Sequence, residues 1–435
     1  MKVTVIGAGL AGCECALALA KKGIKVKLYE MKPEKYSPAH KLPTFGELVC
    51  SNSLRGAGLE NAPGLLKEEM RRLGSIVTEA ADAVKVPAGG ALAVDREKFS
   101  QYITDKVKEN ENIEIIYGEV DKIPEDGYVV IASGPLTSDK LSEEIRTLIG
   151  EDYLHFFDAA APVVTYDSID FDSAFMASRY DKGDADYINC PMNKEEYDIF
   201  YNELINAECA ELKEFENHKV FEGCMPVEVM AKRGEKTLLF GPLKPVGLKD
   251  PRSDKEHYAV VQLRQDNKEK TLYNIVGFQT HLKFPEQKRV FGLIPALKNA
   301  EYARYGVMHR NTFLNSPKLL DNSYRLKKNP NIFFAGQITG VEGYVESAAS
   351  GLAVGIYLSQ IIENGICDVF SRKTAMGALS RYVSDETVVN FQPMNINFGI
   401  IDSLEYRVKG KKEKNTAISM RALEEIDRWK EENKW

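Results

Sequence analysis

Two cysteines lie in sequence settings that favour a reactive thiol. Cys50, in ELVCSNSLR, precedes Ser-Asn-Ser, residues that commonly cap helices, and a thiol beside a helix amino terminus or next to Arg55 would have its thiolate favoured. Cys224, in FEGCMP, lies between Gly223 and Pro226, which indicates a sharply turned loop, where nucleophiles are often placed. Both thiols are therefore candidates for covalent or acid–base chemistry. Each is also compatible with a small buried apolar residue.

A third candidate is His309, which stands among aromatic residues in YGVMHRNTF. An imidazole there could stack on a planar ligand, donate a hydrogen bond or serve only the structure. A metal site is not expected, because the six histidines are scattered and no H-x-x-x-H or C-x-x-C spacing occurs. The chain also lacks the G-x-x-x-x-G-K-[ST] and G-x-S-x-G motifs, which argues against nucleotide-triphosphate hydrolysis and serine hydrolysis.

The elements that would position such groups begin with a glycine-rich loop, VIGAGLAG. It follows an apolar strand at residues 3–6 and opens a helix, so that backbone N–H groups and the helix dipole can hold a pyrophosphate. Glu30 ends the next strand, where an acidic side chain accepts hydrogen bonds from an adenosine ribose; an ordinary surface carboxylate is the alternative. The predicted nucleotide contacts are Gly7, Ala8, Gly9, Leu10, Ala11, Gly12 and Glu30.

A second glycine-containing segment, FFAGQITGVEGYVESAASG, occupies residues 333–351. An apolar strand ending in glycine, at residues 332–336, precedes the start of a helix rich in small residues. This arrangement would bring the chain back onto the nucleotide held by the first loop. The pair of segments therefore favours FAD over an unspecified dinucleotide.

The order of elements predicts an α/β protein, with a Rossmann-type FAD-binding domain and an inserted α+β substrate domain. Residues 1–161 would form the first part of the FAD-binding domain, residues 162–324 the inserted domain, and residues 325–435 the second part with a carboxyl-terminal helix. Strands are expected within residues 113–120 and 128–135, and an amphipathic helix over residues 194–215.

Composition limits the classes of function. The 435 residues are 44% apolar and carry a net charge of −7, which argues against indiscriminate polyanion binding. Lysine and arginine nevertheless recur between residues 232 and 328. They could form an ordinary solvated surface or a local basic face that binds a polyanion. No apolar run reaches the roughly 18 charge-free residues of a membrane span, and Glu14 interrupts the run that imitates a secretion signal. The seven cysteines form no secreted framework, so a cytoplasmic protein with reduced thiols is expected.

Long segments spread over nearly the whole chain resemble the TrmFO family, the folate- and FAD-dependent tRNA uracil-5-methyltransferases. The segments are GAGLAG, ELVCSNSLR, KEEMRRLGS, ASRYDKGDADYINCPM, FEGCMPVEVMAKRG, FGPLKPVGL, YAVVQLRQDN, LYNIVGFQTHLK, KRVFGLIPAL, YGVMHRNTFLNSPKLL, FFAGQITGVEGYVESAASGLA and FQPMNINFGI.

The resemblance implies methylation without S-adenosylmethionine. In that family, reduced FAD takes a methylene group from 5,10-methylenetetrahydrofolate and passes it from flavin N5 to C5 of the T-loop uridine at tRNA position 54, with NADH or NADPH as reductant. Uracil C5 becomes nucleophilic only after a thiolate adds at C6, and a base must later remove the C5 proton. Two thiols brought together by folding could share these tasks.

The resemblance also implies roles for individual residues. Cys224 would attack C6 and Cys50 would be its acid–base partner, with the reverse division of roles as the alternative. Tyr344 would stack near the isoalloxazine, and His309 on the folate pteridine, with Arg310 among the RNA phosphate contacts. Further flavin and ribityl contacts are expected at Gly336, Gln337, Gly340, Glu342 and Gly343.

Three rival functions share these motifs in part. The same chemistry on a ribosomal RNA uridine would leave the catalytic residues unchanged. A relative that modifies the wobble uridine of tRNA is longer and lacks the FEGCMP match, and a flavoprotein could bind tRNA without transferring a methyl group. The preference between NADH and NADPH, the tRNA-contacting residues and the oligomeric state are not determined by these motifs.

Overall fold

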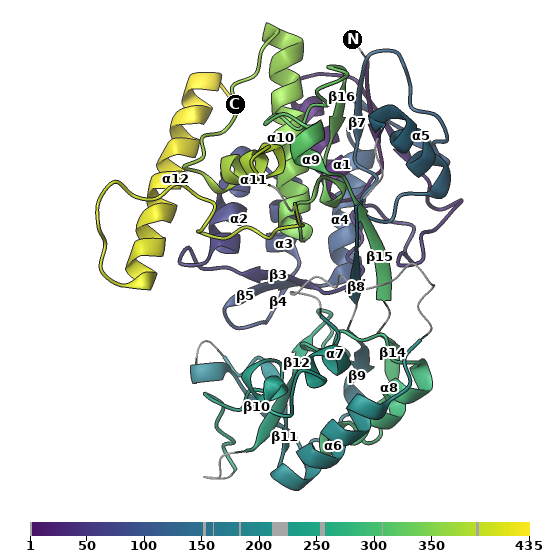
Figure 1. Ribbon diagram of the computed structural model, residues 1–435, viewed down its shortest axis with the longest axis vertical. Helices are drawn as coiled ribbons and strands as arrows, with labels where there is room; N and C mark the ends of the chain where they lie inside the picture. The colour runs from purple at the N-terminus through teal and green to yellow at the C-terminus, as the bar shows by residue number, and fades with distance from the viewer. Residues whose placement is uncertain are drawn as a thin grey trace.

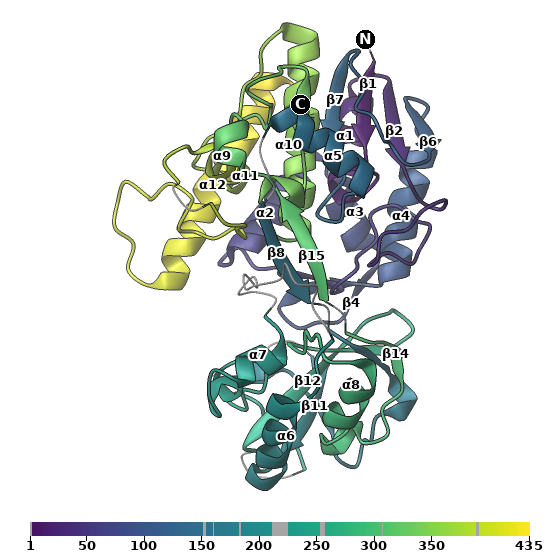
Figure 2. The ribbon, with the colours of Figure 1, turned by 45° about the vertical axis from the view of Figure 1, so that its right-hand side comes forward.

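Two lobes joined by an antiparallel ribbon make up the molecule (Figure 1). The computed structural model describes residues 2–150, 154–159, 161–181, 184–210, 225–252, 257–306, 308–388 and 391–435, with the backbone alone for 154–159, 181 and 308–310. The ribbon pairs β8 (Leu154–Ala159) with β15 (Met308–Phe313). Figure 2 shows it running from the upper lobe toward the lower one.

A five-stranded, wholly parallel sheet forms the centre of the upper lobe. Its order is β16-β7-β1-β2-β6, with β1 in the middle. This is the strand order of a doubly wound nucleotide-binding sheet, and the predicted α/β class is confirmed. The strands are β1 (Val3–Ile6), β2 (Val26–Glu30), β6 (Ile113–Tyr117), β7 (Tyr128–Ile131) and β16 (Ile332–Phe334).

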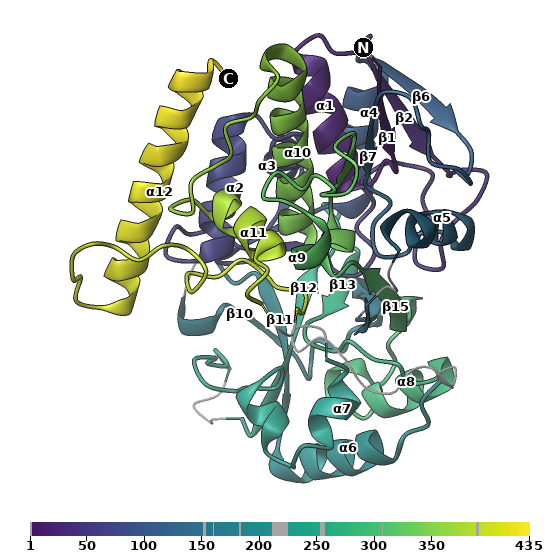
Figure 3. The same ribbon diagram turned by 45° about the horizontal axis from the view of Figure 1, so that its top comes forward.

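Helices cover both faces of this sheet because successive strand residues alternate between the faces. Val3, Val5 and Val130 belong to the larger core, and Ile6 and Ile131 to the smaller core opposite. The larger core contains α1 (Leu10–Lys21), α2 (Ala62–Leu73), α3 (Ile76–Ala83), α4 (Arg96–Lys108), α10 (Tyr344–Asn364), α11 (Ala375–Ser384) and α12 (Lys411–Asn433). The smaller core contains α5 (Asp139–Ile149) and α9 (Ser316–Leu319). Figure 3 shows α12 along the outer side of α2.

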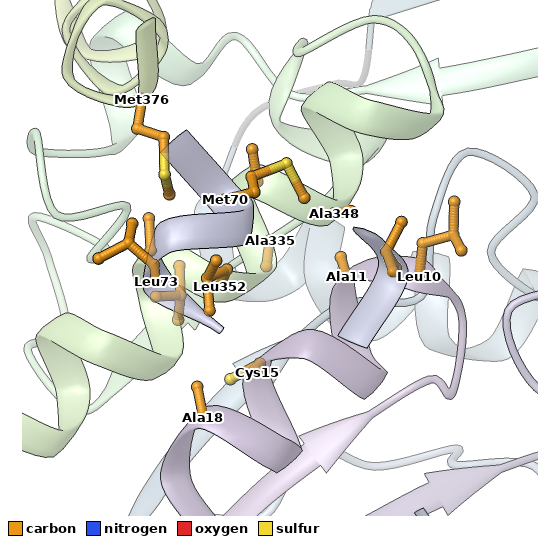
Figure 4. Packing of buried hydrophobic residues seen from close by; sticks show 14 of the residues in the cluster. Leu10, Ala11, Cys15, Ala18, Met70, Leu73, Ala335, Ala348, Leu352 and Met376 are labelled. Atoms are coloured by element: carbon orange, nitrogen blue, oxygen red, sulfur yellow. The ribbon is translucent and has the colours of Figure 1, made fainter. Parts of the chain in front are cut away.

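Helix α1, near the amino terminus, packs closely against α10, which is more than three hundred residues later in the sequence (Figure 4). A Cβ atom on Gly351 would overlap the main chain of Ala11, and one on Gly355 would overlap Cys15. Only glycine permits this approach of two backbones. Helix α10 has the length and composition of a membrane span, but 89% of its apolar window is buried, as in the core helix of a globular lobe.

The lower lobe has an antiparallel sheet of its own, in the order β10-β11-β12-β13-β9-β14, and a separate core. Its strands are β9 (Val163–Thr165), β10 (Phe175–Ala177), β11 (Tyr187–Met192), β12 (Ala259–Gln265), β13 (Leu272–Ile275) and β14 (Tyr302–Arg304). Its α-helices are α6 (Lys194–Asn206), α7 (Val227–Ala231) and α8 (Phe284–Phe291). Helix α6 starts where expected, at a capping box of Asn193 and Glu196, but it ends before residue 215 because Ala207 is extended.

A small sheet, β3-β5-β4, lies at the lower edge of the upper lobe. Its strands are β3 (Ser53–Gly56), β4 (Lys85–Val86) and β5 (Ala91–Val94). Single 3₁₀ turns occur at Tyr166–Ser168, Thr237–Phe240, Pro295–Leu297 and Gln337–Thr339. The turn at Arg179–Asp181 is irregular, because Tyr180 has a φ of 59°. Residues 313–320 return from the ribbon and pack into the cores of the upper lobe through Phe313, Leu314 and Leu319.

Replacing Gly351 with alanine tests the α1–α10 contact. In a helix, alanine is intrinsically more favourable than glycine by about 1 kcal/mol. At this position, however, its methyl group must force the two backbones apart, which costs about 1–3 kcal/mol of folding free energy. We expect Gly351→Ala to lower the free energy of unfolding measured with urea. Gly90→Ala is the matched control, since no described atom lies within 4 Å of a Cβ placed there. Equal stabilities of the two variants would contradict the role of this contact.

Candidate active site

A deep cleft opens at the carboxyl ends of all five parallel strands. This is the crevice where open α/β sheets bind ligands. Its empty space, which extends into open solvent, is about 1120 Å³. Of the predicted nucleotide contacts, the following line it: Gly7, Ala8, Gly9, Leu10, Ala11, Glu30, Gly336, Gln337 and Tyr344. Gly12, Gly340, Glu342 and Gly343 do not.

Two glycines of the first loop have different structural tasks. Gly9 precedes α1, and no described atom lies within 4 Å of a Cβ built on it, so the backbone there is open to a ligand. A Cβ on Gly12 would instead overlap the carbonyl of Gly7. Gly12 therefore serves the tight strand-to-helix turn, which explains why it does not line the cleft.

Glu30 supports the loop as well as lining the cleft. Its Oε2 accepts a hydrogen bond from the Ala8 amide at 2.9 Å, and its Oε1 accepts one from the Lys32 amide at 2.9 Å. The carboxylate is buried, so these bonds fix its orientation. The alternative of an ordinary surface carboxylate is thereby excluded.

The second glycine segment approaches the cleft through a constrained turn. Gly336 has a φ of 85° and donates its amide proton to Ser350 Oγ at 2.7 Å. Gln337 reaches the cleft and donates from Nε2 to both carboxylate oxygens of Glu342 at 2.8 Å. Gly340 packs under the ring of Phe391. Glu342 and the glycines at 340 and 343 thus lie behind the cleft wall.

The hydroxyl of Tyr344 ties α10 to the segment that carries Cys50. Its oxygen accepts hydrogen bonds from the amides of Cys50 at 2.6 Å and Ser51 at 3.3 Å. Burial raises the pKa of Tyr344 well above its usual range, so the phenol stays protonated. Val49 also lines the cleft, which places the partly exposed Cys50 next to its wall.

Three arginines surround the Cys50 segment. Arg96 donates to the carbonyls of Leu48 at 3.2 Å and Cys50 at 3.4 Å, and pairs with Asp266 at 2.9 Å. From the lower lobe, Arg264 donates to Ser51 Oγ at 2.8 Å and Arg304 to the Val49 carbonyl at 3.4 Å. Burial acts to lower the pKa of Arg96, but the charge of Asp266 and further contacts raise it above its usual range. Three guanidinium groups therefore lie beside this segment, and one of them, Arg96, is paired with Asp266.

The positive charge does not come from the source expected from sequence. Arg55 forms an ion pair with the buried Glu346, and residues 51–53 lead into strand β3 and not into a helix. Arg96, Arg264 and Arg304 lie far from Cys50 in the sequence, and no motif around them indicates that they would approach it.

The sequence analysis also missed the residues that line the cleft after β7. The apolar strand that ends in ASGP could have indicated them. They are Ala132, Ser133, Gly134, Pro135, Leu136, Thr137 and Ser138.

The remaining predicted site residues lie partly or wholly outside the described structure. Cys224 belongs to residues 211–224, which are not described. His309 and Arg310 lie on β15 opposite Asp158 and Phe157, with only their backbones described. The ribbon thus brings their backbone positions to the junction of the two lobes (Figure 2).

Tyr344→Phe tests the link between α10 and the Cys50 segment. Loss of the hydroxyl leaves two amide protons without their acceptor, at a cost of about 1–3 kcal/mol in unfolding free energy. We also expect faster alkylation of Cys50, measured by mass spectrometry, because its segment is released. Tyr382→Phe is the control, since that hydroxyl donates to a carbonyl at the surface. A Tyr344 variant as stable as the control, with unchanged alkylation, would contradict the link.

Comparison with known proteins gives three findings. Residues 2–365 match the family described as glucose inhibited division protein A, GIDA. The methylenetetrahydrofolate–tRNA-(uracil-5-)-methyltransferase TrmFO of Acetivibrio thermocellus is 65% identical over 421 residues, 97% of each chain. The protein of the same name from Listeria monocytogenes is 60% identical over 430 residues, 99% of each chain.

The fold also matches a solved structure. GidA of Aquifex aeolicus, in its form II crystal, superposes with a TM-score of 0.71 over 98% of this chain and 73% of its own, at 17% identity. At that identity the match concerns the fold alone, and it agrees with the parallel sheet and the inserted antiparallel one. The family match over residues 2–365 and the identity along nearly the entire length show that the chain belongs to the GIDA family and, more narrowly, to the TrmFO family.

Proposed function

We propose that this protein methylates C5 of the T-loop uridine at position 54 of tRNA, using 5,10-methylenetetrahydrofolate and FAD. The observation that carries the proposal is the identity of 65% and 60%, over nearly full length, to relatives named for folate-dependent tRNA uracil-5 methylation. The cleft at the carboxyl ends of the parallel strands supports it, because its position and its glycine loop suit a dinucleotide cofactor.

The residues present fit FAD. The backbone at Gly9 is open to a pyrophosphate at the start of α1, and Glu30 offers its remaining lone pairs to a ribose. Gly336, Gln337 and Tyr344 would meet the ribityl chain and the flavin, with Gly340, Glu342 and Gly343 shaping that wall from behind. When bound, FAD supplies the reducible ring that carries one carbon from folate to uracil. NADH or NADPH would supply the electrons.

The chain's own residues would activate the uracil. The Cys224 thiolate forms a bond to C6, and the electron pair of the C5–C6 double bond moves onto the ring as an enolate. After C5 has taken the one-carbon unit, Cys50 would remove the C5 proton and the unit would be released from its carrier. Electrons that come from NADH or NADPH would then reduce the methylene to a methyl group, and the Cys224 thiolate would leave C6 as the C5–C6 double bond forms again. The guanidinium groups of Arg96, Arg264 and Arg304 support this role for Cys50, because positive charge favours its thiolate.

Folate would meet the flavin edge near the junction of the lobes. We propose that His309 stacks on the pteridine and that Arg310 contacts an RNA phosphate, as their positions on the connecting ribbon permit. We also propose that residues 162–324 act as the inserted substrate domain, between the two parts of the FAD-binding domain, in a cytoplasmic enzyme. The lobe with its own core supports the division. No disulfide joins any two of the six described cysteines, which supports the proposed compartment.

A basic and apolar surface follows α7 and suits RNA. Residues 232–252 carry six basic and two acidic side chains in a chain of net charge −7. Lys232, Lys236 and Lys249 are exposed, and Phe240, which lies between them in the sequence, has 81% of its surface exposed. Lysines attract phosphates, and an exposed aromatic ring can stack on an unpaired base. We propose that this surface, the α7 face, docks the T-arm whose uridine is flipped into the cleft.

Label transfer tests the function. With NADPH or NADH, labelled methylenetetrahydrofolate and a tRNA transcript, we expect label in 5-methyluridine at position 54, and none when folate is omitted. Cys224→Ala should abolish covalent trapping on a 5-fluorouridine tRNA fragment. Cys50→Ala should still form the adduct but lose turnover by at least about 100-fold, because proton removal then lacks its base.

Other outcomes select the rivals. Label in a ribosomal RNA fragment and not in tRNA would support the ribosomal substrate. Flavin reduction and tRNA binding without label transfer would indicate a binding protein. An adduct that survives loss of Cys224 but vanishes without Cys50 would reverse the roles of the two thiols.

Charge removal tests the α7 face. A triple Lys232→Gln, Lys236→Gln, Lys249→Gln variant should weaken tRNA binding and reduce the slope of log affinity against log salt by about 2–3, roughly one per phosphate contact. Phe240→Ala should weaken binding by about 1–3 kcal/mol without changing that slope. The matched control replaces the exposed Lys411, Lys412 and Lys414 on α12. Equal slopes for the two triple variants would exclude docking at this face.

A further inference from the structure

A thiol, a carboxylate and an imidazole converge in the lower lobe, away from the cleft. Cys209 follows α6, Glu228 lies in α7, and His281 precedes α8. The three ligand atoms all lie within 4.8 Å of one another, and His281 Nδ1 is 2.5 Å from Glu228 Oε1. We call these three residues the lower-lobe cluster. None of them has a part in the proposed methyl transfer.

Backbone hydrogen bonds hold the three segments in register. Cys209 forms a β-bridge with Leu282, and the Ala210 amide donates to the His281 carbonyl at 2.8 Å. At the start of α7, the Val227 amide donates to the Gln279 carbonyl at 2.7 Å. The ligand-bearing backbones are thus fixed to residues 279–282, and only side-chain rotations are needed to adjust the distances.

The carboxylate is oriented as metal-binding carboxylates are. Its Oε2 accepts a hydrogen bond from Thr280 Oγ1 at 2.8 Å, and its Oε1 accepts one from the His281 amide at 2.9 Å. Supporting hydrogen bonds of this kind fix the direction of a ligand and tune its affinity. Glu228 is 1% exposed, so the charge it presents is poorly hydrated and favours a cation.

The imidazole supplies an independent indication. His281 Nδ1 is buried, and within the described part of the chain it makes no hydrogen bond of good geometry despite its short contact with Glu228. A buried nitrogen without an aligned hydrogen-bond partner calls for an explanation. Burial acts to lower the pKa of His281, but its contacts with Cys209 and Glu228 raise that pKa to about 9, so a metal ion between the three donors would displace the proton from Nδ1 and take up its lone pair.

We propose that Cys209 Sγ, His281 Nδ1 and Glu228 Oε1 bind a zinc-like divalent cation. A thiolate ligand disfavours magnesium and calcium, which prefer oxygen, whereas mixed sulfur, nitrogen and oxygen donors suit Zn²⁺. At metal–ligand distances of about 2.0–2.3 Å, tetrahedral donors lie roughly 3.3–3.8 Å apart, so Nδ1 and Oε1 separate by about 1 Å on binding. Three protein ligands leave a fourth position for water.

The ion would cross-link the lobe at a specific place. Cys209 precedes residues 211–224 in the sequence and Glu228 follows them, so one ion would fasten both flanks to residues 279–282. Metal binding to the folded state alone adds directly to folding free energy. The lower lobe should therefore be more resistant to heat with the metal than without it.

Cobalt substitution tests the site in the full-length protein. After chelator treatment under reducing conditions, one equivalent of Co²⁺ should give the thiolate-to-cobalt charge-transfer band and the visible bands of tetrahedral cobalt, both removed by Zn²⁺. Cys209→Ser should abolish the charge-transfer band. Glu228→Gln and His281→Gln should each weaken Co²⁺ affinity by at least about tenfold. Zn²⁺ should raise the melting temperature of the wild type but not of Cys209→Ser.

Control variants separate this site from other thiols. Cys367→Ser, which removes a partly exposed thiol of the upper lobe, and Cys224→Ser should keep the full cobalt spectrum. A charge-transfer band that persists in Cys209→Ser, or vanishes in either control, would overturn the assignment. So would binding without any thiolate band, which would leave the three groups as a metal-free ion-pair cluster. Methyl transfer is not the readout, so these outcomes do not depend on the proposed function.

Discussion

The contact between α1 and α10 is the constraint on which the rest of the upper lobe depends. Gly351 and Gly355 let the two backbones touch, and this sets the turn at residues 336–344 beside the first glycine loop. Because both helices begin at the carboxyl ends of parallel strands, their amino termini converge on one cleft. A cofactor held there is contacted by residues more than three hundred positions apart. Larger side chains at this contact would move the two halves of the cleft relative to each other.

The Cys50 segment depends on a second set of contacts, which joins the lobes. Tyr344 holds its amides from one side, while Arg96, Arg264 and Arg304 hold its carbonyls and the Ser51 hydroxyl from the other. Asn52 adds hydrogen bonds to the Val94 and Gln265 carbonyls, at 3.0 and 2.8 Å. The segment is therefore positioned by both lobes at once. Under the proposed mechanism, the acid–base thiol would stand where a flavin from one lobe meets RNA docked on the other.

Local motifs predicted much of the fold because their physics is local. The alternation of apolar residues with glycine at residues 3–12 determines a strand, a turn and a helix, whatever the rest of the chain does. The strand near residues 332–336, the helix that follows it and the carboxyl-terminal helix were predicted in the same way and are present in the structure. The end of α6 was placed too late, because residues 208–210 pair with residues 281–283 instead of continuing the helix. That pairing is a tertiary contact without a local sequence pattern.

The sequence by itself determined the family, the α/β class and the loop that opens onto the cleft, because these reside in contiguous residues. Only the tertiary structure decided which charges surround Cys50. Arg55, the cation expected beside it, is paired with Glu346, and three arginines distant in the sequence lie beside the Cys50 segment instead. The tertiary structure also brought together Cys209, Glu228 and His281, which no spacing motif in the sequence connects. Spacing motifs detect ligands that lie on one helix or loop. Ligands contributed by three separate segments become neighbours only through the pairing of their backbones and the packing of the lobe around them.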